Sequence, residues 1–128
     1  MTFFQFLVIL IFSDSNLKPE NLAVAIISGK EMISTRVKSQ AQTWFPTFPQ
    51  VFVYSDEFPK SEVEEIHKSS PHANITFVPI IGKYEHIVGS QWKHPWYSAQ
   101  PRFLPSMYDL WLRNRNKDVF WYVLGDDD

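Results

Sequence analysis

LAVAIIS, residues 22–28, is apolar at nearly every position. A run of this kind is typical of a parallel strand that is covered on both faces of a sheet. Three further segments have strand character: VFVYS (51–55), ITFVP (75–79) and VFWYVL (119–124). Stretches with helical spacing separate these segments, and this alternation predicts an α/β fold with a mostly parallel, doubly wound sheet.

The predicted helices follow from apolar residues that recur on one face. The first begins near Ser34 and places four apolar side chains on one face: Ile33, Val37, Ala41 and Trp44. The second lies in PKSEVEEIHKSS (59–70), where acidic residues occupy the first turns. A third is expected over LPSMYDLWL (104–112), and the proline-rich stretch 82–105 is expected to be a long ordered loop.

The composition predicts one globular domain. The 128 residues are 45% hydrophobic and 20% charged, which allows a buried core and argues against disorder. Twelve basic and fourteen acidic residues give a net charge of -2, so the sequence lacks the basic field that nucleic-acid binding requires. The sequence has no cysteine, which excludes disulfides and thiolate metal sites.

The first residues of the sequence predict a targeting segment. FFQFLVILIF (3–12) is almost unbroken apolar sequence, and as a helix it would span about 15 Å, half of a bilayer core. We interpret residues 1–15 as a signal peptide or short signal-anchor, with a buried first strand as the alternative. NIT (74–76) matches the N-glycosylation acceptor pattern. These features predict the secretory pathway, in the Golgi or endoplasmic reticulum, and leave membrane association through the N-terminus open.

FWYVLGDDD (120–128) runs an apolar strand into three carboxylates. The three carboxylates repel one another unless a cation binds to them, and carboxylate oxygens are suitable ligands for Mg²⁺, Mn²⁺ or Ca²⁺. A solvated acidic end is the alternative. Ligands of doubly wound sheets bind beyond the carboxyl ends of the strands, and SGKEMISTR (28–36) leaves the first strand at that edge. Lys30 and Arg36 can meet phosphate or a nucleotide there, although an exposed basic residue is the plainer interpretation of Lys30.

STRVKSQAQTWFP (34–46) contains a Thr-Arg pair and, eight residues after the Arg, the Trp of a Thr-Trp pair: Thr35, Arg36, Thr43 and Trp44. VFVYSDE (51–57) is a strand with an acidic exit, and YDLW precedes DVFWYVLGDDD (118–128). In this combination the stretches resemble the first helix, the second strand and the Asp-x-Asp element of the Fringe-like beta-1,3-glycosyltransferases. The resemblance covers most of residues 22–128.

The resemblance implies a glycosyltransferase A-type, Rossmann-like fold, of which residues 16–128 form the N-terminal, nucleotide-sugar-binding half. It implies a UDP-sugar donor, a divalent cation (Mn²⁺, or Mg²⁺ in its place) and transfer of a hexose with inversion to a glycan or glycoprotein acceptor. Asp128 and Asp126 would hold the metal, and Asp126 and Asp127 would contact the ribose or metal-bound water. Arg36 would contact the nucleotide. The catalytic base is expected beyond residue 128, so the chain is interpreted as an incomplete, inactive part of a longer enzyme.

Two other classes of protein stay open. A receiver-type signalling domain also holds Mg²⁺ on acidic residues beyond a parallel strand. Such a domain should have a phosphoacceptor aspartate and a later lysine, whereas here the acids end the sequence after a secretory-looking leader. The second alternative is a non-catalytic secreted carbohydrate-binding or interaction protein on the same fold. Donor binding and donor hydrolysis separate this protein class from the enzyme.

Overall fold

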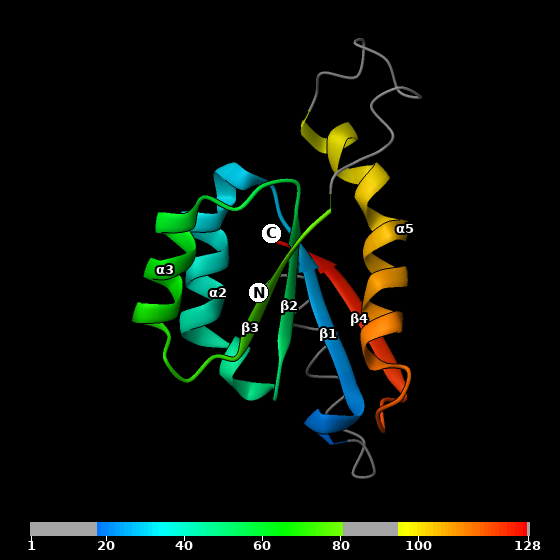
Figure 1. Ribbon diagram of the computed structural model, residues 1–128. Helices are drawn as coiled ribbons and strands as arrows, with labels where there is room; N and C mark the ends of the chain where they lie inside the picture. The colour runs from blue at the N-terminus through cyan, green and yellow to red at the C-terminus, as the bar shows by residue number, and fades with distance from the viewer. Residues whose placement is uncertain (1–17, 81–94, 128) are drawn as a thin grey trace.

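The computed structural model describes residues 18–80 and 95–127, with residues 95–102 placed by their backbone only. Its centre is a four-stranded parallel sheet in the order β3-β2-β1-β4 (Figure 1). The strands are β1 (Leu22–Ile27), β2 (Val51–Ser55), β3 (Ile75–Pro79) and β4 (Trp121–Asp126). The predicted α/β arrangement with a parallel sheet is confirmed.

Helices cover both faces of this sheet. The helical elements are η1 (Pro19–Asn21), η2 (Lys30–Met32), η3 (Ile33–Val37), α2 (Lys38–Thr43), η4 (Phe45–Thr47), α3 (Lys60–Ser69) and α5 (Pro95–Asn114). Among them, η3 is a single π-helical turn that continues into α2. α2 and α3 lie on one face of the sheet and α5 lies on the other (Figure 1). None of the helices in the described ranges is long and apolar enough to cross a membrane.

β1 lies between β2 and β4 and is buried along its whole length, as the sequence predicts. Its alternate residues enter two separate apolar clusters. Val24 and Ile26 belong to the cluster that contains Val37 of η3. Ala25 belongs to the cluster that contains Leu110 of α5. A central strand with a core on each face is what a near-continuous apolar run requires.

The sequence prediction is wrong at the start of the third helix. α5 begins at Pro95, so residues 95–105 are helical instead of forming a loop. Residues 82–94 of the predicted loop lie outside the described residues. A proline suits the first helical position, because its missing N–H needs no partner there. Pro101 and Pro105 then stand inside the helix, at a cost that packing of α5 against the sheet offsets.

Two other predicted boundaries also shift. The first helical segment begins earlier than predicted, through the 3-10 turn η2. The sequence predicts the last strand over 119–124, whereas β4 runs from Trp121 to Asp126. The cause is the pairing with β1, which places Ile26 opposite Gly125 and Ile27 opposite Asp126. The strand therefore carries the first acidic residue of the motif to the edge of the sheet.

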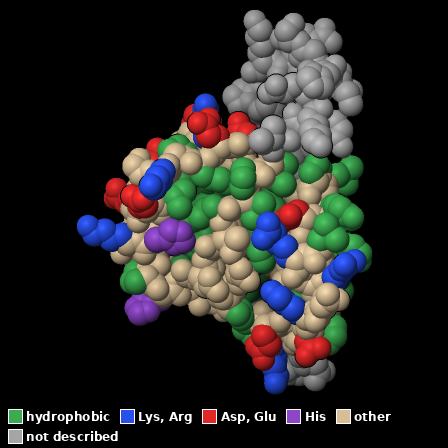
Figure 2. Space-filling model, in the orientation of Figure 1, with side chains coloured by type: hydrophobic (Ala, Val, Ile, Leu, Met, Phe, Trp, Pro, Cys, Tyr) green, Lys and Arg blue, Asp and Glu red, His purple; other side chains and the backbone are tan. Residues whose placement is uncertain are grey.

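The outer side of α5 exposes several large apolar side chains. They are Phe103, Leu104, Tyr108, Trp111 and Leu112. Figure 2 shows hydrophobic side chains along the α5 side and in the upper middle of the face drawn, with charged side chains of both signs mainly at the upper left and the lower right. A surface helix usually carries polar side chains on the side that faces solvent.

Tyr54 joins β2 to α5 through its hydroxyl group. The hydroxyl donates a hydrogen bond of 2.7 Å to Asp109 Oδ2, and Arg113 Nε donates one of 2.6 Å to the same oxygen. The pKa of Tyr54 is raised well above its usual 10.0, mainly by burial and secondly by the hydrogen bond to Asp109. The Tyr54 hydroxyl therefore stays protonated, and keeps its hydrogen bond to α5, across the neutral range.

Tyr54→Phe is expected to lower the free energy of unfolding by about 1 kcal/mol at neutral pH, because Asp109 loses a donor. Folding raises the pKa of Tyr54, so above pH 10.0 the side chain ionises in the unfolded chain but stays protonated in the folded one. This ionisation stabilises the unfolded state. The difference between wild type and Tyr54→Phe should therefore narrow between roughly pH 9 and pH 11 in urea unfolding. Tyr108→Phe, on the exposed side of α5, is the matched control. A difference that stays constant with pH would contradict the prediction.

Candidate functional site

The carboxyl ends of β1 and β4 lie side by side at one edge of the sheet, with Ile27 paired to Asp126. From β1 the sheet extends through β2 to β3 on one side, and β4 lies on the other side of β1. The boundary between β1 and β4 is therefore the topological switch point, beside which ligands of open α/β sheets bind. Side chains that follow β1 and β4 meet at this place.

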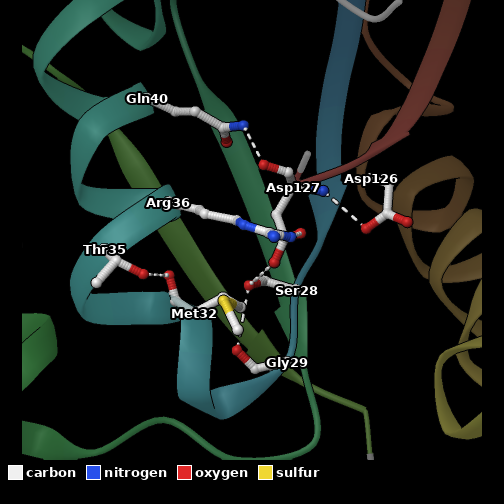
Figure 3. A network of polar contacts seen from close by, with 8 residues as sticks. All are labelled: Ser28, Gly29, Met32, Thr35, Arg36, Gln40, Asp126 and Asp127. Carbon is white, nitrogen blue, oxygen red and sulfur yellow. Dashed lines mark hydrogen bonds and ion pairs between the residues drawn. The ribbon is translucent and has the colours of Figure 1, made fainter. Parts of the chain in front are cut away.

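Asp127, the residue after β4, is buried at this edge, with only 6% of its side chain exposed. Ser28 Oγ donates a hydrogen bond of 2.6 Å to Oδ2 of Asp127 (Figure 3). Arg36 Nη1 lies 3.0 Å from Oδ1 and donates to it. Gln40 Nε2 donates a hydrogen bond of 2.9 Å to the backbone oxygen of the same residue. One aspartate is thus held by three side chains that follow β1 in the sequence.

Arg36 lies in η3, the π-helical turn after β1. The first turns of a helical segment carry a partial positive charge, which disfavours a cation there. The carboxylate of Asp127 offsets this effect, because it lies in direct contact with the guanidinium. The Arg36 side chain is still 45% exposed, so it faces both the buried carboxylate and the solvent. π-helical turns recur at functional sites.

Asp126 is exposed at the end of β4. Its Oδ1 accepts a hydrogen bond of 2.8 Å from the backbone N–H of Asp127, which fixes the turn (Figure 3). Asp128 lies outside the described residues. Within the part of the chain that the structure describes, no group of three His, Asp or Glu residues is placed to hold a metal ion. The structure brings Arg36, Asp126 and Asp127 together, and the ligand role assigned to each stays a prediction.

Ser28 and Gln40 are the two residues of this network that the sequence prediction missed. Ser28 follows the last residue of β1 and is 2% exposed, and a buried hydroxyl needs a partner. Gln40 stands four positions after Arg36, a spacing that places both side chains on one helical face. Its Oε1 is buried and has no hydrogen-bond partner within the described residues. The position of Ser28 after β1 and the spacing of Gln40 from Arg36 point to this network only once Asp127 is known to lie beside these residues.

Lys30 lies after the same strand but belongs to a surface ion pair. Its Nζ is 3.1 Å from Glu57 Oε2, and both side chains are exposed. The hydrogen bond that Lys30 donates to Glu57 is the main cause that raises the pKa of Lys30, and the charge of that carboxylate is the second. The interpretation of Lys30 as an exposed basic residue is confirmed.

No family model, curated protein or solved structure matches this chain. The likeness to Fringe-like glycosyltransferases therefore depends on the motifs quoted from the sequence. The contact of Arg36 with Asp127 at the switch point, beside Asp126, is an observation that does not depend on those motifs.

Ser28→Ala is expected to lower the free energy of unfolding by about 1.5 to 3 kcal/mol, the range for a lost hydrogen bond to a charged group. The cause is that Oδ2 of Asp127 stays buried while its donor disappears. Urea unfolding at neutral pH measures the change. Ser39→Ala, at an exposed position of α2, is the control and should stay within about 0.5 kcal/mol of wild type. Equal effects of the two substitutions would show that the Ser28 hydrogen bond contributes nothing specific.

Proposed function

We propose that this chain is the nucleotide-sugar-binding half of a Fringe-like beta-1,3-glycosyltransferase, on a glycosyltransferase A-type fold. One observation carries the proposal. Arg36 and Asp127 stand 91 positions apart in the sequence, yet they are in contact at the switch point of a parallel sheet. Two motifs that separately resemble parts of a donor site thus lie together, as the binding of one ligand requires.

A divalent cation fits the chemistry of the residues at the end of β4. Asp126 presents an exposed carboxylate there, and Mn²⁺ and Mg²⁺ prefer oxygen ligands of this kind. In the proposed site Asp126 and Asp128 hold the ion. When bound, the cation acts as a Lewis acid that stabilises negative charge on the diphosphate of the donor.

The exposed part of the Arg36 side chain binds the nucleotide in the proposed site. A guanidinium suits this task because its planar set of N–H donors matches the oxygens of a phosphate. The donor is a UDP-sugar, and its hexose passes with inversion to a glycan or glycoprotein acceptor. The scheme assigns donor binding to Arg36, Asp126 and Asp128, and it assigns no catalytic base among them.

A carbohydrate-binding protein without catalysis is the second candidate. Tyr108 and Trp111 favour it, because both are exposed on α5 and their rings stack with centroids 6.0 Å apart. An exposed aromatic side chain can pack against the apolar face of a sugar ring. This surface lies on α5, whereas Arg36 lies in η3 on the other face of the sheet, so substitutions can separate the two candidates.

In calorimetry, the wild-type chain is expected to bind UDP in the presence of Mn²⁺. Asp128→Ala should abolish the metal-dependent part of this binding, because the other acids cannot reproduce the same coordination. Arg36→Ala should weaken UDP binding by about 1.5 to 3 kcal/mol, or roughly 10- to 150-fold, through the lost contact to a charged group.

Two control variants make the outcome of that calorimetry specific. Asp118→Ala removes an exposed carboxylate near the opposite end of β4 and should leave UDP binding unchanged. Trp111→Ala should also leave it unchanged. UDP affinity that is unaltered in both Asp128→Ala and Arg36→Ala, with the fold intact by circular dichroism, would reject the proposed donor site. Loss of glycan binding in Trp111→Ala alone would favour the second candidate.

We also propose that the chain enters the secretory pathway, where Asn74 becomes N-glycosylated. NIT (74–76) is the single acceptor pattern in the sequence, and Asn74 is exposed just before β3. The four described strands pair in parallel, so Asn74 lies at the amino edge of the sheet, opposite to the edge with Asp126. A glycan at this position would therefore leave the proposed donor site open.

The full chain expressed in a secretory cell is expected to shift to lower apparent mass after glycosidase treatment. Asn74→Gln and Thr76→Ala should each remove this shift, because each destroys the acceptor pattern. A second version, with a strong foreign signal peptide in place of residues 1–15, separates targeting from acceptor competence. Glycosylation of that version alone would reject the targeting role of residues 1–15, and glycosylation of neither would reject Asn74 as an acceptor.

A further inference from the structure

On the premise of the proposed donor site, we propose that Asp127 is a positioning residue that acts through Arg36 and does not contact the donor or its metal. Ser28 and Gln40 hold Asp127 in this role. The sequence resemblance implies a different task for Asp127, namely contact with the ribose or metal-bound water. The contacts that Asp127 makes within the protein favour the positioning role.

The polar atoms of Asp127 all have partners within the protein. Oδ1 accepts from Arg36 and Oδ2 accepts from Ser28. The backbone oxygen accepts from Gln40, and the backbone N–H donates to Asp126. Only 7% of the residue is exposed, whereas Asp126 beside it is exposed. A bound cation or ribose can therefore reach Asp126 from solvent, but it meets Asp127 only after this network has opened.

The contact with Asp127 restricts how the Arg36 guanidinium can turn. The guanidinium is planar, so a fixed Nη1 together with the side-chain stem leaves few orientations for the other N–H groups. An arginine that is ordered before binding loses less conformational entropy when it meets a ligand. The Arg36 guanidinium is thus held at the switch point by Asp127, and 45% of the Arg36 side chain remains exposed where the nucleotide is proposed to bind.

Ser28 and Gln40 restrain Asp127 from two directions. Ser28 Oγ donates to Oδ2 and Arg36 Nη1 donates to Oδ1, so each carboxylate oxygen has its own donor. Gln40 Nε2 binds the backbone oxygen, which restrains residue 127 independently of its carboxylate (Figure 3). Supporting residues of this kind keep a ligand-binding side chain within the narrow range of geometries that binding tolerates.

Asp127→Asn tests the positioning role, because it keeps the shape of the side chain and removes its charge. Manganese affinity, followed by the electron paramagnetic resonance of free Mn²⁺, should stay within about threefold of wild type, whereas UDP affinity at saturating Mn²⁺ should fall about tenfold. In an Arg36→Ala background the same substitution should change UDP affinity by less than about twofold, since its effect passes through Arg36. Asp126→Asn is the contrasting variant and should lose Mn²⁺ binding.

A tenfold or larger loss of Mn²⁺ affinity in Asp127→Asn, on the order expected for a metal ligand, would overturn the positioning role. An equal loss of UDP affinity with and without Arg36 would overturn it too. Wild-type protein that binds neither Mn²⁺ nor UDP would overturn the proposed function, and the positioning role with it. Should Asp127→Asn fail to fold, Ser28→Ala takes its place and should show the same split, with UDP affinity reduced about threefold and Mn²⁺ affinity preserved.

Discussion

The buried carboxylate of Asp127 is the constraint on which the carboxyl edge of the sheet depends. Burial takes water away from a carboxylate, so the charged form is stable only where donors and a cation surround it. Ser28 and Arg36 supply them from 99 and 91 positions away in the sequence. None of these contacts exists before β1 and β4 are adjacent. The polar network and the pairing of the two strands therefore form together.

The two faces of β1 show how the rest of the fold supports this edge. The face toward η3 and α2 carries Val24 and Ile26, whereas the face toward α5 carries Ala23 and Ala25. Small side chains leave space between the sheet and α5, and the large side chain of Tyr54 occupies the same layer. Apolar packing thus holds η3, and with it Arg36, against one face while α5 holds the sheet from the other. A site that lies on such packed elements keeps its geometry better than one on a loop.

The sequence predicts the strands well, because each is a short apolar run and β1 is apolar on both faces. It misplaces the start of α5, since Pro101 and Pro105 indicate a loop by local propensity and only packing on the sheet outweighs them. For the candidate site, too, the sequence predicts some residues and misses others. Arg36 and the acidic residues stand in recognisable motifs, but Ser28 and Gln40 acquire their roles from a partner that is distant in the sequence. Long-range contacts of this kind leave no local pattern.

The charges at the switch point explain why a cation belongs in the proposed site. Arg36 contributes +1 and Asp126 and Asp127 contribute −1 each, so these three residues sum to −1 (1 − 2). Lys30 adds no net charge, because it is paired with Glu57. Two like unit charges about 4 Å apart repel each other by about 4 kcal/mol at an effective dielectric constant of about 20. A diphosphate would meet this repulsion at the edge of the sheet, whereas a divalent cation in the proposed site would add a charge of +2 and offset it. In the proposed site, the need for a cation would follow from these charges, whichever sugar the nucleotide carries.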